Sequence, residues 1–504
     1  MMDKNKKRKQ RALRVAITNI FMGISVVAIV FVLMFIAMGY SFNNKSGELE
    51  QSGLVQIDSE PSGATVEIDG TTQFSHTEMN KMLSPGVHHL VVSKSGYDIW
   101  KKDLSVDTGL LTRIEWIRLF PVSPEVSDVT SFKDVRLANY SADRKVLLVI
   151  EQANPDIIVL NIQDDQVNRT VISLATALGT DDATALTGTI AIKTWSRSSD
   201  KVLLTWEHND TTTWHLVELN KDNTKKSLDL TTKFNLQFSN ILAANDSASK
   251  LWGIENGNLR LIDADNLTIS GVIAKNVEKI TNNKDTVAFV NANDDGNRFV
   301  STYKDGEDGP VVIVKLEKET PTINLAMGTY WGAEWLAYAK DKHVEIISGS
   351  YPSYGKSDSA NFKTTIKKDL SYVPQLISVD SDERILALAA DKNMSSIDLE
   401  TKHTYDYTFE NAISKINWLD GFLTWQKTDD NKIFVRDFDG DNRREIVSNA
   451  DNDYGVNITD NNNWLYYFNV SKPETTEATA ATTSTTTSAT TTTTYTLKRE
   501  KLNI

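Results

Sequence analysis

One phrase recurs along most of this 504-residue chain and constrains its fold more than any other feature. Each copy has an aromatic or polar residue, a turn rich in Ser, Asp and Asn, and then an apolar strand. Tyr140–Ile150 and Trp195–Trp206 are clear examples, and eight copies follow one another at spacings of 36 to 55 residues. Short strands repeating at about 45 residues are typical of a β-propeller, in which each repeat forms one four-stranded blade.

The repeats occupy residues 131–504, which amounts to about 47 residues per repeat if there are eight. We therefore expect a β-propeller of eight blades, with seven as the alternative if the first or last copy is partial. The phrase resembles the repeats of TolB-like and WD40-like propellers, and the segment Ile433–Ile446 is the nearest match. This resemblance implies a fold and no particular activity.

A Thr-rich run at 474–494 interrupts the last repeat. Such a low-complexity segment cannot build a core. The sequence then alternates like a strand again from Tyr495 to Leu502. We therefore expect a long loop at 474–494 inside the last blade, followed by a final strand that returns to close the ring.

The N-terminus predicts a membrane anchor. Val15–Met38 contains no charged residue, and a helix of this length would cross a hydrocarbon core of about 30 Å. Residues 1–14 carry seven Lys or Arg against Asp3, which predicts a cytoplasmic N-terminus and extracytoplasmic domains after a transmembrane helix at 15–40. A cleaved signal peptide is the alternative, although its apolar region is usually only about 7–15 residues long.

A small β-sandwich is expected at 53–120, between linkers at 41–52 and 121–130. Its short strands are separated by turns, at which Gly63 and Gly70 can adopt positive φ angles. The order of its motifs, Glu60–Val66, Ile68–Gly70, Leu83–Gly86 and Lys94–Tyr97, resembles the PEGA domain. That resemblance implies an exported or surface-attached protein and no catalytic residue. The chain departs from the family pattern at Thr71–Thr77, where we expect a longer or reshaped loop.

Composition excludes several classes of function. The chain has no cysteine, which excludes disulfides, thiol catalysis and Cys-based zinc sites. Its formal net charge is −13, and the basic head leaves about −19 on the remainder. Nucleic acid is therefore not an expected partner, because phosphate binding requires a basic face. No cofactor is implied.

The sequence offers few candidates for chemistry. Asp437, Asp439, Asp441 and Glu445 could supply oxygen ligands to calcium, but a hairpin turn at Asp439-Gly440 explains the same residues. His88 and His89 would point to opposite faces of a strand, which disfavours a shared metal. No residue is predicted to be catalytic, because neither a Gly-x-Ser-x-Gly elbow nor a His-Glu-x-x-His motif occurs.

Most of the eleven tryptophans fall at equivalent positions of the repeat, where a large ring would pack between blades. We expect this packing role for Trp195, Trp206, Trp331, Trp418 and Trp425.

Three classes of function fit these features. The first is a membrane-anchored extracytoplasmic binding or scaffold protein, in which a PEGA stalk presents a propeller that recognises a protein or a cell-envelope glycan. The alternative is an anchored propeller enzyme, such as a glycosidase or lyase, which would need two or three converging carboxyl groups with raised pKa values. The third is a transmembrane sensor, but residues 1–14 are too short to form a signalling domain.

Overall fold

A computed structural model describes residues 2–37, 39–42, 49–219, 227–317, 323–356, 361–448, 454–471 and 492–503. Two compact units divide the chain, Met1–Ser123 and Pro124–Ile504. Most of the predicted Thr-rich loop at 474–494, namely residues 474–491, lies outside the described residues.

The first unit begins with one long helix, α1 (Met2–Ala37). Its stretch Arg14–Phe35 is long and apolar enough to cross a membrane, and none of that stretch is buried against the rest of the protein. A helix of this kind at an N-terminus is either an anchor or a signal sequence. The short strands β1 (Tyr40–Phe42) and β2 (Leu49–Gln51) follow and pair with each other, so the predicted linker at 41–52 carries a small hairpin.

Two sheets form the rest of the first unit. The three-stranded sheet has the order β6-β3-β9, and the four-stranded sheet has the order β5-β4-β7-β8. Their strands are β3 (Gly53–Glu60), β4 (Thr65–Ile68), β5 (Thr71–His76), β6 (Met79–Leu83), β7 (Gly86–Ser93), β8 (Trp100–Val106) and β9 (Leu111–Arg118).

Alternation of apolar and polar residues builds the core of these two sheets. Val55 and Ile57 of β3, Val66 of β4 and Trp100 of β8 are fully buried. The predicted reshaped loop at Thr71–Thr77 is largely strand β5. Thr77, just after β5, is buried, and its hydroxyl oxygen accepts a hydrogen bond from the N–H of Ala64.

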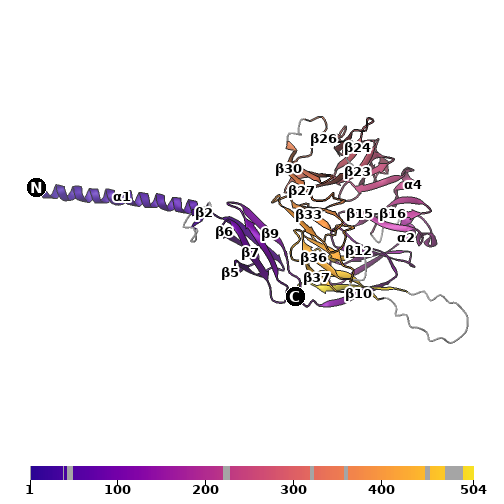
Figure 1. Cartoon of the computed structure of the whole chain (residues 1–504), viewed down its shortest axis with the longest axis horizontal. Coiled ribbons are helices and arrows are strands. Elements are labelled where there is room, and N and C mark those ends of the chain that lie inside the picture. Colours follow the sequence, from indigo (N-terminus) through magenta and orange to yellow (C-terminus); the bar gives the residue numbers. More distant parts are fainter. Residues whose placement is uncertain are drawn as a thin grey trace. The chain divides into compact units, whose positions relative to one another are not determined.

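Eight antiparallel sheets make up the described part of the second unit, seven with four strands and one with three (Figure 1). In chain order, the strands of the first four sheets are β11 (Val135–Tyr140), β12 (Val146–Glu151), β13 (Asp156–Asn161), β14 (Asn168–Ser173); β15 (Thr189–Trp195), β16 (Lys201–His208), β17 (Thr211–Glu218), β18 (Leu228–Asp229); β19 (Phe238–Ala243), β20 (Lys250–Glu255), β21 (Asn258–Asp263), β22 (Thr268–Ile269); and β23 (Val277–Asn283), β24 (Thr286–Ala292), β25 (Arg298–Lys304), β26 (Val311–Leu316).

The remaining four sheets continue the same meander. Their strands are β27 (Ile323–Tyr330), β28 (Ala333–Lys340), β29 (His343–Gly349), β30 (Lys363–Asp369); β31 (Leu376–Val379), β32 (Ile385–Ala390), β33 (Asn393–Asp398), β34 (Thr404–Thr408); β35 (Leu423–Lys427), β36 (Ile433–Asp437), β37 (Arg444–Val447); and β38 (Val456–Ile458), β39 (Trp464–Ser471), β40 (Thr494–Lys501) with β10 (Val126–Lys133).

The second unit is a β-propeller. Contacts join the first strand of one sheet to the first strand of the next, as between β11 and β15 or between β27 and β31. Such contacts are expected when the first strands surround a common axis. The three-stranded sheet is less regular, because Trp418 pairs with Thr424 through a single isolated bridge ahead of β35.

The last sheet joins the two ends of the second unit. β40 pairs with β39 on one side and with β10 on the other, in the order β10-β40-β39-β38. The final strand thus returns after the Thr-rich run as predicted. The structure corrects one boundary, because β10 begins at Val126, inside the predicted linker 121–130. β10 pairs with β40, which is distant in sequence, so the local sequence pattern could not indicate this pairing.

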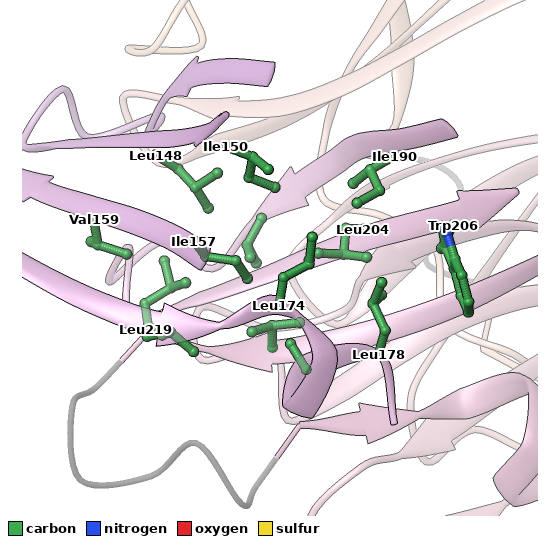
Figure 2. Close-up of a cluster of buried hydrophobic side chains, with 14 of the residues drawn as sticks. Leu148, Ile150, Ile157, Val159, Leu174, Leu178, Ile190, Leu204, Trp206 and Leu219 are labelled. Atoms are coloured by element: carbon green, nitrogen blue, oxygen red, sulfur yellow. The ribbon is translucent and has the colours of Figure 1, made fainter. Parts of the chain in front are cut away.

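Apolar residues from neighbouring sheets meet between them. Figure 2 shows such a cluster, in which Leu148 and Ile157 of the sheet β11–β14 lie near Leu204 of the next sheet. Two short helices, α2 (Leu174–Leu178) and α3 (Asp182–Ala185), connect these sheets, and Leu174 and Leu178 point into the cluster. A third helix, α4 (Leu230–Phe234), connects β18 to β19.

Candidate functional site

Antiparallel strands alternate in direction, so the turns between the first and second strands of all the sheets lie at the same end of the propeller. We call this end the turn face. It comprises the turns 141–145, 196–200, 244–249, 284–285, 331–332, 380–384 and 459–463, together with the turn 420–422, which joins the bridged segment around Trp418 to β35. The recurring phrase of the sequence has its polar residues here.

Five of these turns share one geometry. The first residue, Ser, Asn, Asp or Thr, accepts a hydrogen bond through its side-chain oxygen from the N–H five residues later, and the fourth residue has a positive φ angle. The first and fourth residues are Ser141 and Arg144, Ser196 and Ser199, Asn245 and Ala248, Asp380 and Glu383, and Thr459 and Asn462. The polar residues of the repeat therefore hold the returning strand in register.

The turn between β27 and β28 differs from these five. It consists of Trp331 and Gly332, both with positive φ angles of 49° and 75°. The comparable two-residue turn between β23 and β24 places Lys284 in the same conformation, with φ of 51°. A bulky residue is disfavoured in this region of φ, and the Trp331 side chain is also 71% exposed. Trp331 thus combines an unfavourable backbone conformation with a large exposed apolar surface.

The end of β27, directly before Trp331, is hydrogen-bonded to both neighbouring sheets. Asn283 of the preceding sheet donates a hydrogen bond of 2.7 Å to the Thr329 hydroxyl, and the N–H of Thr329 donates to the carboxylate of Glu383 in the following sheet. The hydroxyl of Tyr330 donates to Glu400 at 2.8 Å. The base of the turn is therefore held in place while the indole projects outward.

The structure corrects one of the predicted packing roles of tryptophan. Trp195 and Trp206 are buried in the cluster between the first two sheets, as expected. Trp418 and Trp425 are half-buried, and the indole N–H of Trp418 donates to Ser378 at 3.0 Å. Trp331 does not pack between sheets, because its turn has only two residues and places the side chain at the tip.

The candidate calcium residues lie on one hairpin but do not share one centre. Asp437 ends β36 and accepts a hydrogen bond of 2.9 Å from the side chain of Asn442. Asp439 accepts the N–H of Asp441 within the turn. Glu445, on β37, instead lies 3.2 Å from the ammonium group of Lys432. Among the described residues, no group of three His, Asp or Glu could hold a metal ion.

The two adjacent histidines bind separate partners. His88 Nδ1 lies 2.6 Å from Asp69 Oδ2, and His89 Nδ1 lies 2.8 Å from Asp103 Oδ1. Each imidazole therefore tethers β7 to a different neighbouring segment.

Among the described residues, two carboxyl groups have strongly raised pKa values, and they belong to different sheets. Burial raises the pKa of Asp380 to about 7, although its carboxylate accepts the N–H groups of Ile385 and Asp382. Burial also raises the pKa of Glu500, on β40, to about 7. Asp380 lies in the turn before β32, whereas Glu500 lies in the last sheet, and within the described ranges no hydrogen bond or ion pair joins the two carboxyl groups.

Residues 52–116 match the model of the PEGA domain, which is the sandwich of the first unit. No curated protein matches the sequence. Solved structures to which the chain is similar at low identity include the following three. The β-propeller domain of Cps50 (Swd1) from Myceliophteria thermophila has 8% identity and a TM-score of 0.40, covering 64% of this chain and 99% of that one. The C-terminal WD40 domain of Sif2 has 14% identity and a TM-score of 0.43, with coverages of 74% and 97%. AztD from Citrobacter koseri has 12% identity and a TM-score of 0.35, with coverages of 72% and 92%.

Proposed function

We propose that this chain is a membrane-anchored extracytoplasmic binding protein, in which the PEGA domain links the anchor to a β-propeller that docks a protein partner through its turn face. It is not an enzyme in this proposal. The anchor is α1, with the basic residues 1–14 in the cytoplasm and both folded units outside. Support for this orientation comes from the seven Lys and Arg residues that precede the apolar stretch.

The docking proposal depends mainly on one observation: the indole of Trp331 is exposed, and the base of its turn is already held in place by hydrogen bonds. Tryptophan is enriched among the residues that contribute most to protein interfaces, because it buries a large area at low conformational cost. Hydrogen bonds from both neighbouring sheets already hold the end of β27, the strand that directly precedes Trp331. Docking would therefore cost little additional ordering of the chain.

Site-specific photo-crosslinking in intact cells tests the docking proposal. A photoreactive phenylalanine analogue at position 331 of the full chain is expected to capture a discrete partner. The matched control is position 171, because Val171 is also exposed but lies on β14. Equal capture at both positions, or none at position 331, would reject the turn face as the docking surface.

Thiol labelling tests the proposed orientation. The chain has no cysteine, so a single Ser247→Cys variant on the exposed turn 244–249 offers one thiol. We expect a membrane-impermeant maleimide to label this thiol in intact cells. Labelling that requires cell lysis would place the propeller in the cytoplasm and refute the proposal.

A further inference from the structure

One end of the PEGA sandwich adjoins the end of α1, and we call it the anchor end. The strands β3 and β9 begin there and β6 ends there, because Leu54 pairs with Met82 on β6 and with Leu111 on β9. The turn 107–110 lies at the same end, since the N–H of Leu54 donates a hydrogen bond of 2.9 Å to the carbonyl oxygen of Leu110.

Several contacts tie the anchor end to α1. The N–H of Ser52, directly before β3, donates a hydrogen bond of 2.8 Å to the carbonyl oxygen of Gly39. A Cβ atom added to Gly39 would meet Met82 Cε at 3.0 Å, so the Met82 side chain lies against the backbone at this point. The rings of Phe35 and Tyr40 meet edge to face, with centroids 5.4 Å apart. Phe35 is the last residue of the stretch that is apolar enough to cross a membrane.

An apolar row crosses the three-stranded sheet at the anchor end. Met82, Leu54 and Leu111 are register partners on neighbouring strands, so their side chains share one face. This is the outer face, because Val55, the next residue of β3, is fully buried in the core. Met82 and Leu111 are 43% and 44% exposed, and Leu110 next to Leu111 is 57% exposed. We call Met82, Leu54, Leu110 and Leu111 the apolar row.

The same face becomes polar one row further from α1. There Gln56 of β3 pairs with Asn80 and with Arg113. The two rows are two residues apart along β3, which is about 7 Å. The polar headgroup region on each side of a bilayer is roughly 5–8 Å thick. The change from apolar to polar on this face therefore matches the change from lipid to water.

The position of α1 identifies what covers the apolar row. None of the stretch Arg14–Phe35 is buried against the protein, so in the proposed anchor lipid surrounds it. Gly39 lies four residues after Phe35, which is at most about 14 Å even for an extended chain. Tyrosine is enriched in the interfacial region, where Tyr40 would lie. Because Met82 contacts Gly39, the apolar row begins in that region as well.

We propose that the anchor end of the PEGA domain is a lipid-contact surface, with the apolar row lying in the interfacial region of the bilayer. The inference rests on the proposed anchor role of α1 and adds a second contact with the membrane. The turn 107–110 contains Asp107 and no Lys or Arg. The contact therefore depends on burial of apolar surface and not on attraction to anionic lipid.

Fluorescence quenching on the full chain, in nanodiscs of zwitterionic phosphatidylcholine that include nitroxide-labelled lipid, tests this proposal. The chain has no cysteine, so Leu110→Cys offers one thiol for a fluorescent label. The matched control is Ile99→Cys, because Ile99 is also exposed but directly precedes β8 at the opposite end of the sandwich. The seven residues of β8 span about 20 Å.

We expect the nitroxide lipid to quench the label at position 110 about twofold or more strongly than the label at position 99, because of this separation. Equal quenching at the two positions, or none at position 110, would overturn the proposal. A label on Ser25→Cys, within α1, reports on the anchor itself. Quenching at position 25 without quenching at position 110 would reject the lipid contact and leave the anchor intact, whereas quenching at neither would reject both.

A charged variant tests whether the apolar row holds the domain on the bilayer. The reporter is a label on Val87→Cys, because Val87 is exposed near the start of β7, which the turn 84–85 joins to the end of β6. Leu110→Glu with Leu111→Glu is expected to reduce quenching at position 87 by about half or more, since two apolar contacts are lost. Ile99→Glu is the control and leaves the quenching unchanged.

Unchanged quenching in the double variant would refute a role of the apolar row in membrane contact. Thermal unfolding is measured alongside, and Leu110→Glu alone, in an exposed turn, tests the same contact if the double variant is unstable. Crosslinking at position 331 is expected to be unaffected by these variants, so failure of the lipid contact is distinguishable from failure of the docking proposal.

Discussion

Arg384 and Asp398 form a doubly hydrogen-bonded ion pair inside the propeller. The distances are 2.9 Å from Nε to Oδ1 and 2.8 Å from Nη2 to Oδ2, and both side chains are about 1% exposed. Arg384 is the last residue of the turn 380–384, directly before β32, and Asp398 ends β33, so the pair joins the start of the second strand of this sheet to the end of the third. The remaining guanidinium nitrogen, Nη1, lies 2.9 Å from Glu400 Oε2.

Replacing Arg384 by Met should destabilise the propeller strongly. The variant leaves the Asp398 carboxylate buried without its cation, a change that typically lowers the free energy of unfolding by about 3–5 kcal/mol. Urea unfolding followed by tryptophan fluorescence measures the effect. The double variant R384M/D398L is expected to lose less than R384M alone, and a double variant that loses more would argue against an uncompensated charge as the cause.

Closure of the ring by β10 can be tested with a disulfide. Ser131 and Thr496 are register partners on β10 and β40, and their hydroxyl oxygens lie 3.1 Å apart. Because the chain has no cysteine, S131C/T496C should form one defined disulfide. We expect oxidation to raise the free energy of unfolding by about 2–4 kcal/mol by constraining the unfolded chain. Failure to form the bond in the folded protein would contradict the pairing, and the single variant S131C is the control.

Glu500 should make stability depend on pH. Burial raises the pKa of its carboxyl group to about 7 from an ordinary value of 4.5. Between these two values the folded state binds more proton than the unfolded state, so stability is fully present below pH 4.5 and falls as pH rises to about 7. Glu500→Gln should remove this slope. The measurement is the difference in Tm between the two proteins across that range, and a constant difference would contradict a raised pKa.

Gly455 should be irreplaceable because of both its conformation and its neighbour. Its φ angle is 75°, and an added Cβ would lie 2.4 Å from the Trp425 ring. Gly455→Ala should therefore displace the indole, shift the tryptophan fluorescence and lower the free energy of unfolding by more than the conformational cost alone. Gly179→Ala is a matched control, since Gly179 has φ of 70° with no atom within 4 Å of the added Cβ. In that control the free energy of unfolding should fall only by about 1–2 kcal/mol, the cost of placing an alanine at a positive φ angle. Similar behaviour of the two variants would show that the contact with Trp425 is unimportant.

The sequence allowed the propeller to be predicted because its repeat is a physical unit. In five of the eight turns, a residue such as Ser141 or Thr459 begins the turn, its side-chain oxygen binds the returning strand, and apolar residues follow. β10 escaped prediction because its pairing with β40 links segments more than 350 residues apart, and nothing local marks such a pair. The helices α2 and α4 have only five residues each, too few to give a helical period.

The candidate sites were harder to predict for a related reason. Trp331 shares its spacing with buried tryptophans, and only the length of its turn places it at the surface. A hollow between the sheets β31–β34 and β35–β37 is lined by Phe409, Lys415 and Thr424, so its composition depends on packing between repeats. Local pattern carries no information on which side chains converge in this way.

Trp331→Asn should separate stability from docking. Asparagine tolerates positive φ angles far better than a bulky residue, and the lost indole is exposed, so little packing disappears with it. We expect the free energy of unfolding to stay the same or to rise by up to about 1 kcal/mol. Recovery of the docked partner from cells after general chemical crosslinking should fall sharply in the same variant.

Lys284→Asn is the matched control, because Lys284 occupies the same conformation in the turn between β23 and β24. It should be equally neutral for stability and should leave recovery of the partner unchanged. A loss of more than about 2 kcal/mol in Trp331→Asn would show that the indole has a structural role in the fold. Such a loss would mean that the fold itself requires the Trp331 side chain. Its unfavourable backbone conformation and its exposure would then no longer be evidence for a binding role.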